Sequence, residues 1–120
     1  MFQRGILEMK YFIDEEQRKL SGSTTYFEFI KGKYRGKCWL PDSLSLDMDE
    51  FDRLGLDKLI SSAVPSFDYF GLTKITLRDR EKILSKAHAV GGEAEAAVAE
   101  IDEWAREVFS EYECITIFGI

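Results

Sequence analysis

The sequence predicts a single α+β domain over residues 1–120, in which helices pack on one face of a mainly antiparallel sheet. Three observations predict this class. The chain opens with segments rich in β-branched and aromatic residues, continues with apolar residues at three- and four-residue spacing, and closes with a continuously apolar segment. Of its 120 residues 45% are apolar, which is enough for one core without disulfides or bound metal.

The first third of the chain predicts a meander of three antiparallel strands. Apolar and polar residues alternate over 7–13, and the segment TTYFEFIK at 24–31 is rich in β-branched and aromatic residues. A turn at 31–33 contains glycine and leads into a third expected strand at 34–40, which Pro41 ends. These strands, together with one from the C-terminus, are expected to form the sheet.

Two short helices are predicted next. Asp47 or Ser45 is expected to cap the first, which contains residues 48–54 and ends at a glycine. The second helix carries apolar residues at helical spacing over 56–63 and stops at Pro65. Both helices are expected to turn their apolar residues toward the sheet.

The second half of the chain predicts a short extended piece, two helices and a last strand. The segment 66–76 has turn residues around an aromatic pair, and Thr76 can cap a helix that has Asp79 at its third position. After a glycine pair, an apolar stripe runs from Ala94 to Tyr112, the strongest helical pattern in the chain. The closing segment CITIFGI is typical of a buried strand.

The net charge and its distribution along the chain disfavour some classes of function. The chain has 22 acidic and 16 basic residues, a net charge of −6, which disfavours a dedicated binder of nucleic acid or anionic membrane. The charge is arranged in blocks: residues 1–40 and 70–86 each carry +3, whereas 41–69 carry −5 and 87–120 carry −7. The N-terminus is too densely charged for a signal peptide, and no run of about 20 apolar residues exists to span a bilayer, so a cytoplasmic location is expected.

No pattern of catalytic or metal-binding residues stands out. With two cysteines and one histidine, the chain lacks the ligands of a usual zinc site. The acidic segment 42–57 begins like a calcium loop at Asp47, but Asp52 occupies the position that needs glycine and Lys58 the position that needs glutamate. His88 suits a helix C-terminus better than catalysis. We therefore expect no metal, no cofactor and no enzymatic activity.

Two aromatic segments have alternative interpretations. The basic, aromatic stretch at 26–39 resembles a platform for single-stranded nucleic acid, but alternation along a strand favours core aromatics and edge lysines. Aromatics at 67–70 lie in an expected turn, where they either fill the core or serve as recognition anchors.

The second half of the chain also carries a family resemblance. The segment SFDYFGLTKITLRDREKIL, a helix with EIDEW and the terminal ECITIFGI together resemble the small immunity proteins of bacterial contact-dependent inhibition and polymorphic toxin systems. The resemblance covers roughly residues 64–120, and Arg80 departs from it, because a tryptophan is expected near that position. It implies a protein without catalytic residues that binds and neutralises a cognate toxin domain in the cytosol.

Many such toxins are nucleases with basic clefts, so an acidic partner surface would match them. We expect the toxin interface to include the carboxylates of the segment 42–57 and the neighbouring turn. The candidate residues are Asp42, Asp47, Asp49, Glu50, Asp52, Asp57, Asp68 and Tyr69.

Other interpretations remain open at this point. The chain could be a small enzyme or ligand-binding domain with a cleft between sheet and helices, which a deep pocket gathering Asp, Tyr and His88 would favour. It could also be an adaptor that dimerises through an exposed strand edge. The acidic helix near the C-terminus is an alternative docking surface.

Overall fold

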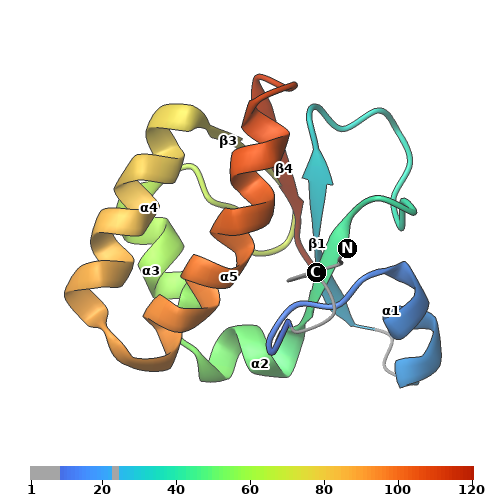
Figure 1. Ribbon diagram of the computed structural model, residues 1–120, viewed down its shortest axis with the longest axis horizontal. Coiled ribbons are helices and arrows are strands. Elements are labelled where there is room, and N and C mark those ends of the chain that lie inside the picture. The colour runs from blue at the N-terminus through green and yellow to red at the C-terminus, as the bar shows by residue number, and fades with distance from the viewer. Residues whose placement is uncertain (1–8, 23–24) are drawn as a thin grey trace, which may run out of the picture.

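The computed structural model describes residues 9–22 and 25–120, and the fold within them is α+β (Figure 1). Four strands form one antiparallel sheet in the order β2-β1-β4-β3, accompanied by five helices in these residues. The predicted fold class is confirmed. The strands are β1 (Tyr26–Lys31), β2 (Leu44–Asp47), β3 (Leu72–Thr76) and β4 (Cys114–Phe118); the helices are α1 (Glu15–Ser21), α2 (Met48–Arg53), α3 (Leu56–Ala63), α4 (Leu77–Val90) and α5 (Gly92–Phe109).

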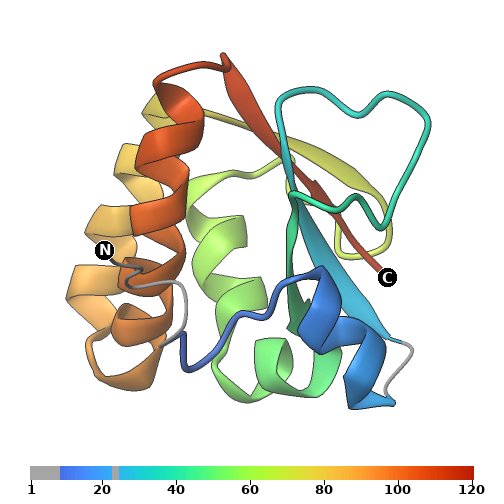
Figure 2. The same ribbon diagram turned by 45° about the vertical axis from the view of Figure 1, so that its right-hand side comes forward.

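The sheet has one face toward the helical layer. Phe29 pairs across the sheet with Leu44 of β2 and Ile117 of β4, and all three are buried in the core. Figure 2 shows α3, α4 and α5 together on this side. The loop 32–43 and α1 lie on the opposite side, where Arg18 of α1 stacks over the ring of Trp39. The main helical layer therefore covers one face, as predicted, while α1 is an addition on the other.

The predicted strand at 34–40 is wrong, since this segment is a loop. Gly32, Gly36 and Trp39 all have positive φ, which interrupts an extended chain. The N–H groups of Trp39 and Leu40 donate to the carboxylate of Glu28, both at 2.7 Å, instead of to a neighbouring strand. The strand that does pair with β1 is the later segment β2.

The predicted strand at 7–13 is also wrong over the part that the structure describes, and residues 7 and 8 lie outside the described residues. The N–H groups of Lys10, Tyr11 and Phe12 donate to the Glu100 carboxylate on α5. Only Ile13 forms a bridge, with Ser45. A side chain takes the hydrogen bonds that a strand would have used, so the expected meander does not form.

Helix α1 was not predicted, although its ends carry clear signals. Asp14 caps the helix and forms a reciprocal capping box with Gln17, and Gly22 ends it with φ of 80°. No residue of α1 is buried. Because the prediction relied on apolar periodicity, a helix without an apolar face escaped it.

The other helices form as predicted. Asp47 caps α2 by accepting the N–H of Asp49 at 2.8 Å. Thr76 and Asp79 form the capping box of α4. The stripe of α5 is buried through Ala94, Ala97, Val98, Ala105 and Val108. Over residues 9–22 and 25–120, no helix has the length and apolarity to cross a membrane.

Candidate partner-binding surface

Short helices α2 and α3 bring acidic residues to one end of the molecule. Asp49 lies in the first turn of α2 and Asp57 in the first turn of α3, where negative charge is favoured by the helix dipoles. Gly55, with φ of 71°, supplies the left-handed residue between the two helices. The side chains of Phe51 and Leu56 are buried beneath, which leaves Asp49, Asp52 and Asp57 exposed.

Tyr69 links these carboxylates to the core. Its ring packs edge-on against Phe27 and Phe51, with centroids 5.0 and 6.1 Å away. Its hydroxyl donates to Asp52 Oδ1 at 2.9 Å. Burial raises the pKa of Tyr69 to about 12, and the hydrogen bond to Asp52 and the charges of Asp52, Asp57 and Asp49 add to that rise. Three carboxylates that the sequence analysis selected, Asp49, Asp52 and Asp57, therefore each raise the pKa of the Tyr69 hydroxyl.

We define the acidic patch as Asp49, Asp52, Asp57, Asp68 and Tyr69. The four aspartates are exposed and Tyr69 is half-buried. Asp68 precedes Tyr69 in the turn between α3 and β3, and its Oδ1 accepts the N–H of Phe70 at 2.9 Å. Five of the eight predicted interface residues are thus gathered in one place.

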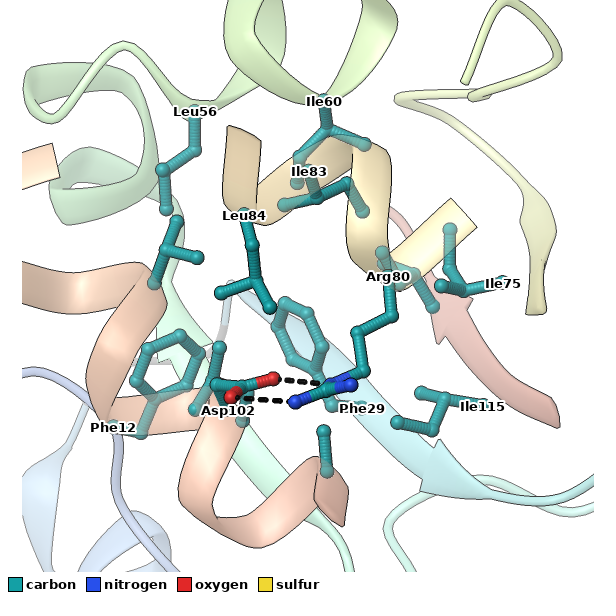
Figure 3. A pocket seen from close by; sticks show the side chains of 14 residues that line it. Phe12, Phe29, Leu56, Ile60, Ile75, Arg80, Ile83, Leu84, Asp102 and Ile115 are labelled. Atoms are coloured by element: carbon teal, nitrogen blue, oxygen red, sulfur yellow. Dashed lines mark hydrogen bonds and ion pairs between the residues drawn. The ribbon is translucent and has the colours of Figure 1, made fainter. Parts of the chain in front are cut away.

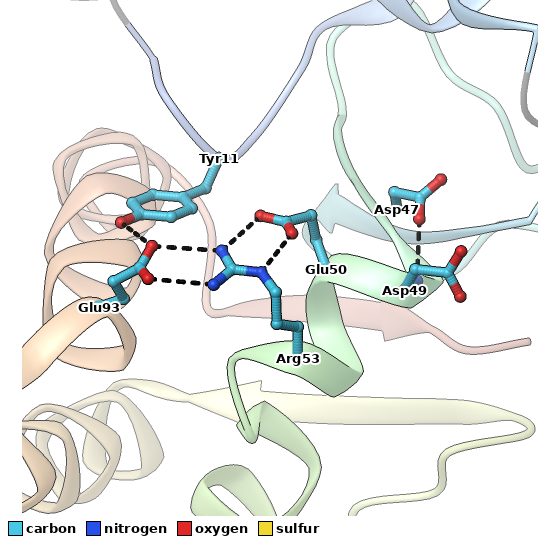
Figure 4. Close-up of polar contacts among 6 residues, drawn as sticks. All are labelled: Tyr11, Asp47, Asp49, Glu50, Arg53 and Glu93. Atoms are coloured by element: carbon cyan, nitrogen blue, oxygen red, sulfur yellow. Dashed lines mark hydrogen bonds and ion pairs between the residues drawn. The ribbon is translucent and has the colours of Figure 1, made fainter.

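The remaining three predicted residues are placed differently. Glu50 forms a bidentate pair with Arg53, which also pairs with Glu93 of α5, and Tyr11 donates to Glu93 (Figure 4). The hydrogen bond from Arg53 holds the pKa of Glu50 below its ordinary value, and that of Glu93 likewise. Glu50 is therefore engaged in a contact between α2 and α5.

Asp47 and Asp42 flank strand β2. Asp47 ends the strand and caps α2 with its side chain. Asp42 precedes the strand, in the exposed part of the loop 32–43. Asp42 lies before the first residue of β2 and Asp47 is its last residue, so the length of that strand separates Asp42 from α2, which carries Asp49 and Asp52.

The structure distinguishes Phe70 from the other aromatic residues of the turn at 67–70, although it was not among the eight candidate residues. Phe70 is 75% exposed, and its ring meets that of Tyr69 edge-on, with centroids 4.9 Å apart. The aromatic turn at 67–70 was recognised as either core or anchor. It contains both: Phe67 and Tyr69 pack against the core, whereas Phe70 projects from it.

The environment of Tyr69 gives a testable pH dependence. Its pKa is raised from 10.0 to about 12 in the folded chain, so the folded state keeps this proton at a pH where the unfolded state loses it. The resulting stabilisation is complete below pH 10 and is lost as the pH rises from 10 to 12. We expect the difference in unfolding free energy between wild type and Tyr69→Phe to shrink over that range. Urea titrations at pH 8 to 11.5 measure it, and a constant difference would contradict the assignment.

A cavity of about 70 Å³ lies between the sheet and helices α3, α4 and α5 (Figure 3). Its lining is almost wholly apolar, and its charged members, Arg80 and Asp102, form a bidentate pair at 2.6 and 3.0 Å. Neither Tyr69 nor His88 lines it. This cavity therefore does not gather the Asp, Tyr and His88 that the enzyme interpretation called for.

Among the described residues, the contacts of His88 do not include either cysteine, so they give no cysteine–histidine pair. The side chain of His88, in the last turn of α4, is 87% exposed, and its Nδ1 lies 3.0 Å from Glu95 Oε2. Cys114 is buried in β4, while Cys38 is half-buried in the loop 32–43, and both are free thiols. In the part of the chain that the structure describes, no cluster of three or more His, Cys, Asp or Glu side chains could hold a metal ion.

Comparisons with known proteins identify no relative of this chain. No protein-family model matches the chain, and no curated protein or solved structure is significantly similar to it.

Proposed function

We propose that this chain is an immunity protein that binds a cognate toxin domain in the bacterial cytosol and neutralises it. The observation that carries the proposal is the acidic patch, in which exposed carboxylates from α2, α3 and the 67–71 turn surround one half-buried tyrosine. The resemblance of residues 64–120 to immunity proteins gives the class of partner. The patch fits a basic protein surface such as the cleft of a nuclease.

The negative charge of the acidic patch also suits rapid capture of a basic toxin. An immunity protein has to capture its toxin before damage occurs, and complementary charge raises association rates toward about 10⁸ M⁻¹s⁻¹ at low salt. Asp49 and Asp57 lie in the first turns of α2 and α3, Asp52 accepts the Tyr69 hydroxyl, and Asp68 accepts the N–H of Phe70. The structure of the free chain therefore already holds these carboxylates in place. A preformed charged surface reduces the ordering cost of association.

The decisive experiment co-expresses the chain with the product of the gene immediately upstream of its own. Rescue of growth, together with recovery of a complex, supports the proposal. A neighbouring product that is toxic and is not neutralised, or that is not toxic and forms no complex, contradicts it.

Charge reversal tests the surface. We expect the triple change Asp49→Lys, Asp52→Lys and Asp57→Lys to weaken toxin binding by about 10- to 100-fold at low salt and to flatten its salt dependence. A matched control reverses three exposed carboxylates on and after α5, Glu103, Glu107 and Glu111, with the same change in net charge. Titration calorimetry at several salt concentrations compares the two. A larger effect of the control would move the interface to α5.

A second candidate function is dimerisation as an adaptor, which the position of β3 favours. This strand lies at the edge of the sheet, and its Leu72 is 46% exposed. Exposed edges are templates for pairing with another chain. Light scattering on the purified chain distinguishes the two, because the adaptor requires a dimer without toxin.

A further inference from the structure

Phe70 is an exposed aromatic residue on a turn with a firmly held backbone. Its own N–H donates to Asp68, and the N–H of Gly71 donates to the Asp68 carbonyl at 3.2 Å. Two bonds tie the turn to the chain end: Gly119 N–H to the Gly71 carbonyl at 2.7 Å and Ile120 N–H to the Tyr69 carbonyl at 2.9 Å. The backbone of the turn that presents this ring is therefore ordered before any partner arrives, which lowers the cost of association.

The ring lies in an acidic environment. Asp68 is two residues away and its carboxylate bonds the Phe70 backbone. Tyr69, whose ring touches that of Phe70, bonds Asp52 through its hydroxyl and lies within the influence of Asp57. Each carboxylate oxygen has two lone pairs, so Asp52 keeps acceptor capacity beyond the tyrosine hydroxyl.

Two kinds of partner group could cover such a ring. An apolar pocket closing over Phe70 would remove water from the nearby carboxylates without giving them partners, which is costly. A guanidinium group matches both the exposed ring and the nearby carboxylates, because it stacks on an aromatic face and donates pairs of hydrogen bonds to carboxylates. The negative potential beside the ring adds to the attraction of a cation for its face.

We propose that Phe70 and the carboxylates of Asp68 and Asp52 form the receiving site for an arginine side chain of the partner protein. The inference rests on the proposed function for the identity of that partner, but the site itself is a property of this chain. The guanidinium lies over the Phe70 ring and pairs with the carboxylates.

Three substitutions at Phe70 test the contact in the complex with the toxin. Phe70→Ala and Phe70→Leu are both expected to weaken binding by about 3- to 30-fold, the range of a cation–π contact. Phe70→Trp is expected to keep wild-type affinity or exceed it, since tryptophan is the best cation–π partner. Thermal unfolding should stay unchanged in all three, because the residue is exposed. Wild-type affinity of Phe70→Leu would overturn the proposal in favour of an apolar contact.

A probe that needs no toxin separates this inference from the proposed function. In NMR titrations with N-acetyl-arginine amide, we expect saturable shifts at residues 52 and 68–70 that Phe70→Leu abolishes. Equal shifts along the acidic face of α5, or unchanged shifts in Phe70→Leu, would refute the arginine site. Failure of growth rescue together with these localised shifts would refute the immunity function and leave the arginine site standing.

Discussion

Replacing Glu28 with alanine is expected to lower the free energy of unfolding by about 3–5 kcal/mol. This carboxylate on β1 is 1% exposed and accepts three hydrogen bonds of 2.7 Å, from the N–H groups of Trp39 and Leu40 and from the Ser43 hydroxyl. Without it, the two backbone N–H donors of the loop 32–43 lose their partner, whereas the Ser43 hydroxyl keeps the Leu40 carbonyl as an acceptor at 2.9 Å. Urea denaturation measures the loss.

A conservative variant makes the test sharper. Glu28→Gln keeps the shape but turns one acceptor oxygen into an amide that faces a backbone N–H, so a loss of about 2 kcal/mol is expected. Glu103→Gln, at an exposed position of α5, is the matched control and should be nearly neutral. Hydrogen exchange at the amides of Trp39 and Leu40 should accelerate in both Glu28 variants. Unchanged exchange at these amides would mean that the carboxylate does not hold the loop.

Glu28 also explains why the strand prediction failed. The segment 34–40 has strand-like composition, and the pattern alone does not reveal that a buried side chain will take its hydrogen bonds. Trp39 has φ of 59°, an uncommon conformation for a residue other than glycine. A similar capture by Glu100 removes residues 10–12 from the sheet. Strand pairing is therefore the part of this fold that local sequence does not determine.

Helices α2 to α5 and the last strand were predictable because their signals are local. Caps at Asp47 and Thr76 and the stripe of α5 depend on residues within a few positions of one another. The acidic patch was predictable in part for the same reason. The pair of Glu50 with Arg53 three residues later is also local. What local sequence does not determine is the contact of Arg53 with Glu93, forty residues away, which fixes this pair between α2 and α5.

Replacing Phe51 with alanine is expected to cost about 3–5 kcal/mol of unfolding free energy. Phe51 is fully buried and stacks on Phe27 with centroids 3.8 Å apart and planes 17° from parallel. It is the residue through which α2 packs on the sheet, and its ring also contacts Tyr69. Its loss leaves a cavity beneath α2 and Tyr69 of the 67–71 turn, two of the three elements that carry the acidic patch. Phe51→Leu fills most of that space and should cost markedly less.

Replacing Phe70 with alanine distinguishes an effect on stability from an effect on toxin binding, because the Phe70 ring is exposed whereas the Phe51 ring is buried. Phe70→Ala should change the unfolding free energy by no more than about 0.5 kcal/mol while weakening binding. Phe51→Ala should have its main effect on stability. Toxin binding of Phe51→Ala should be measured at a temperature well below the unfolding midpoint of this variant. Under that condition we expect a loss of affinity only if the spacing between α2 and the 67–71 turn changes. If Phe51→Ala cost less than about 1 kcal/mol, the ring would not be part of a packed core, and the acidic patch would lack the rigid support on which its preorganisation depends.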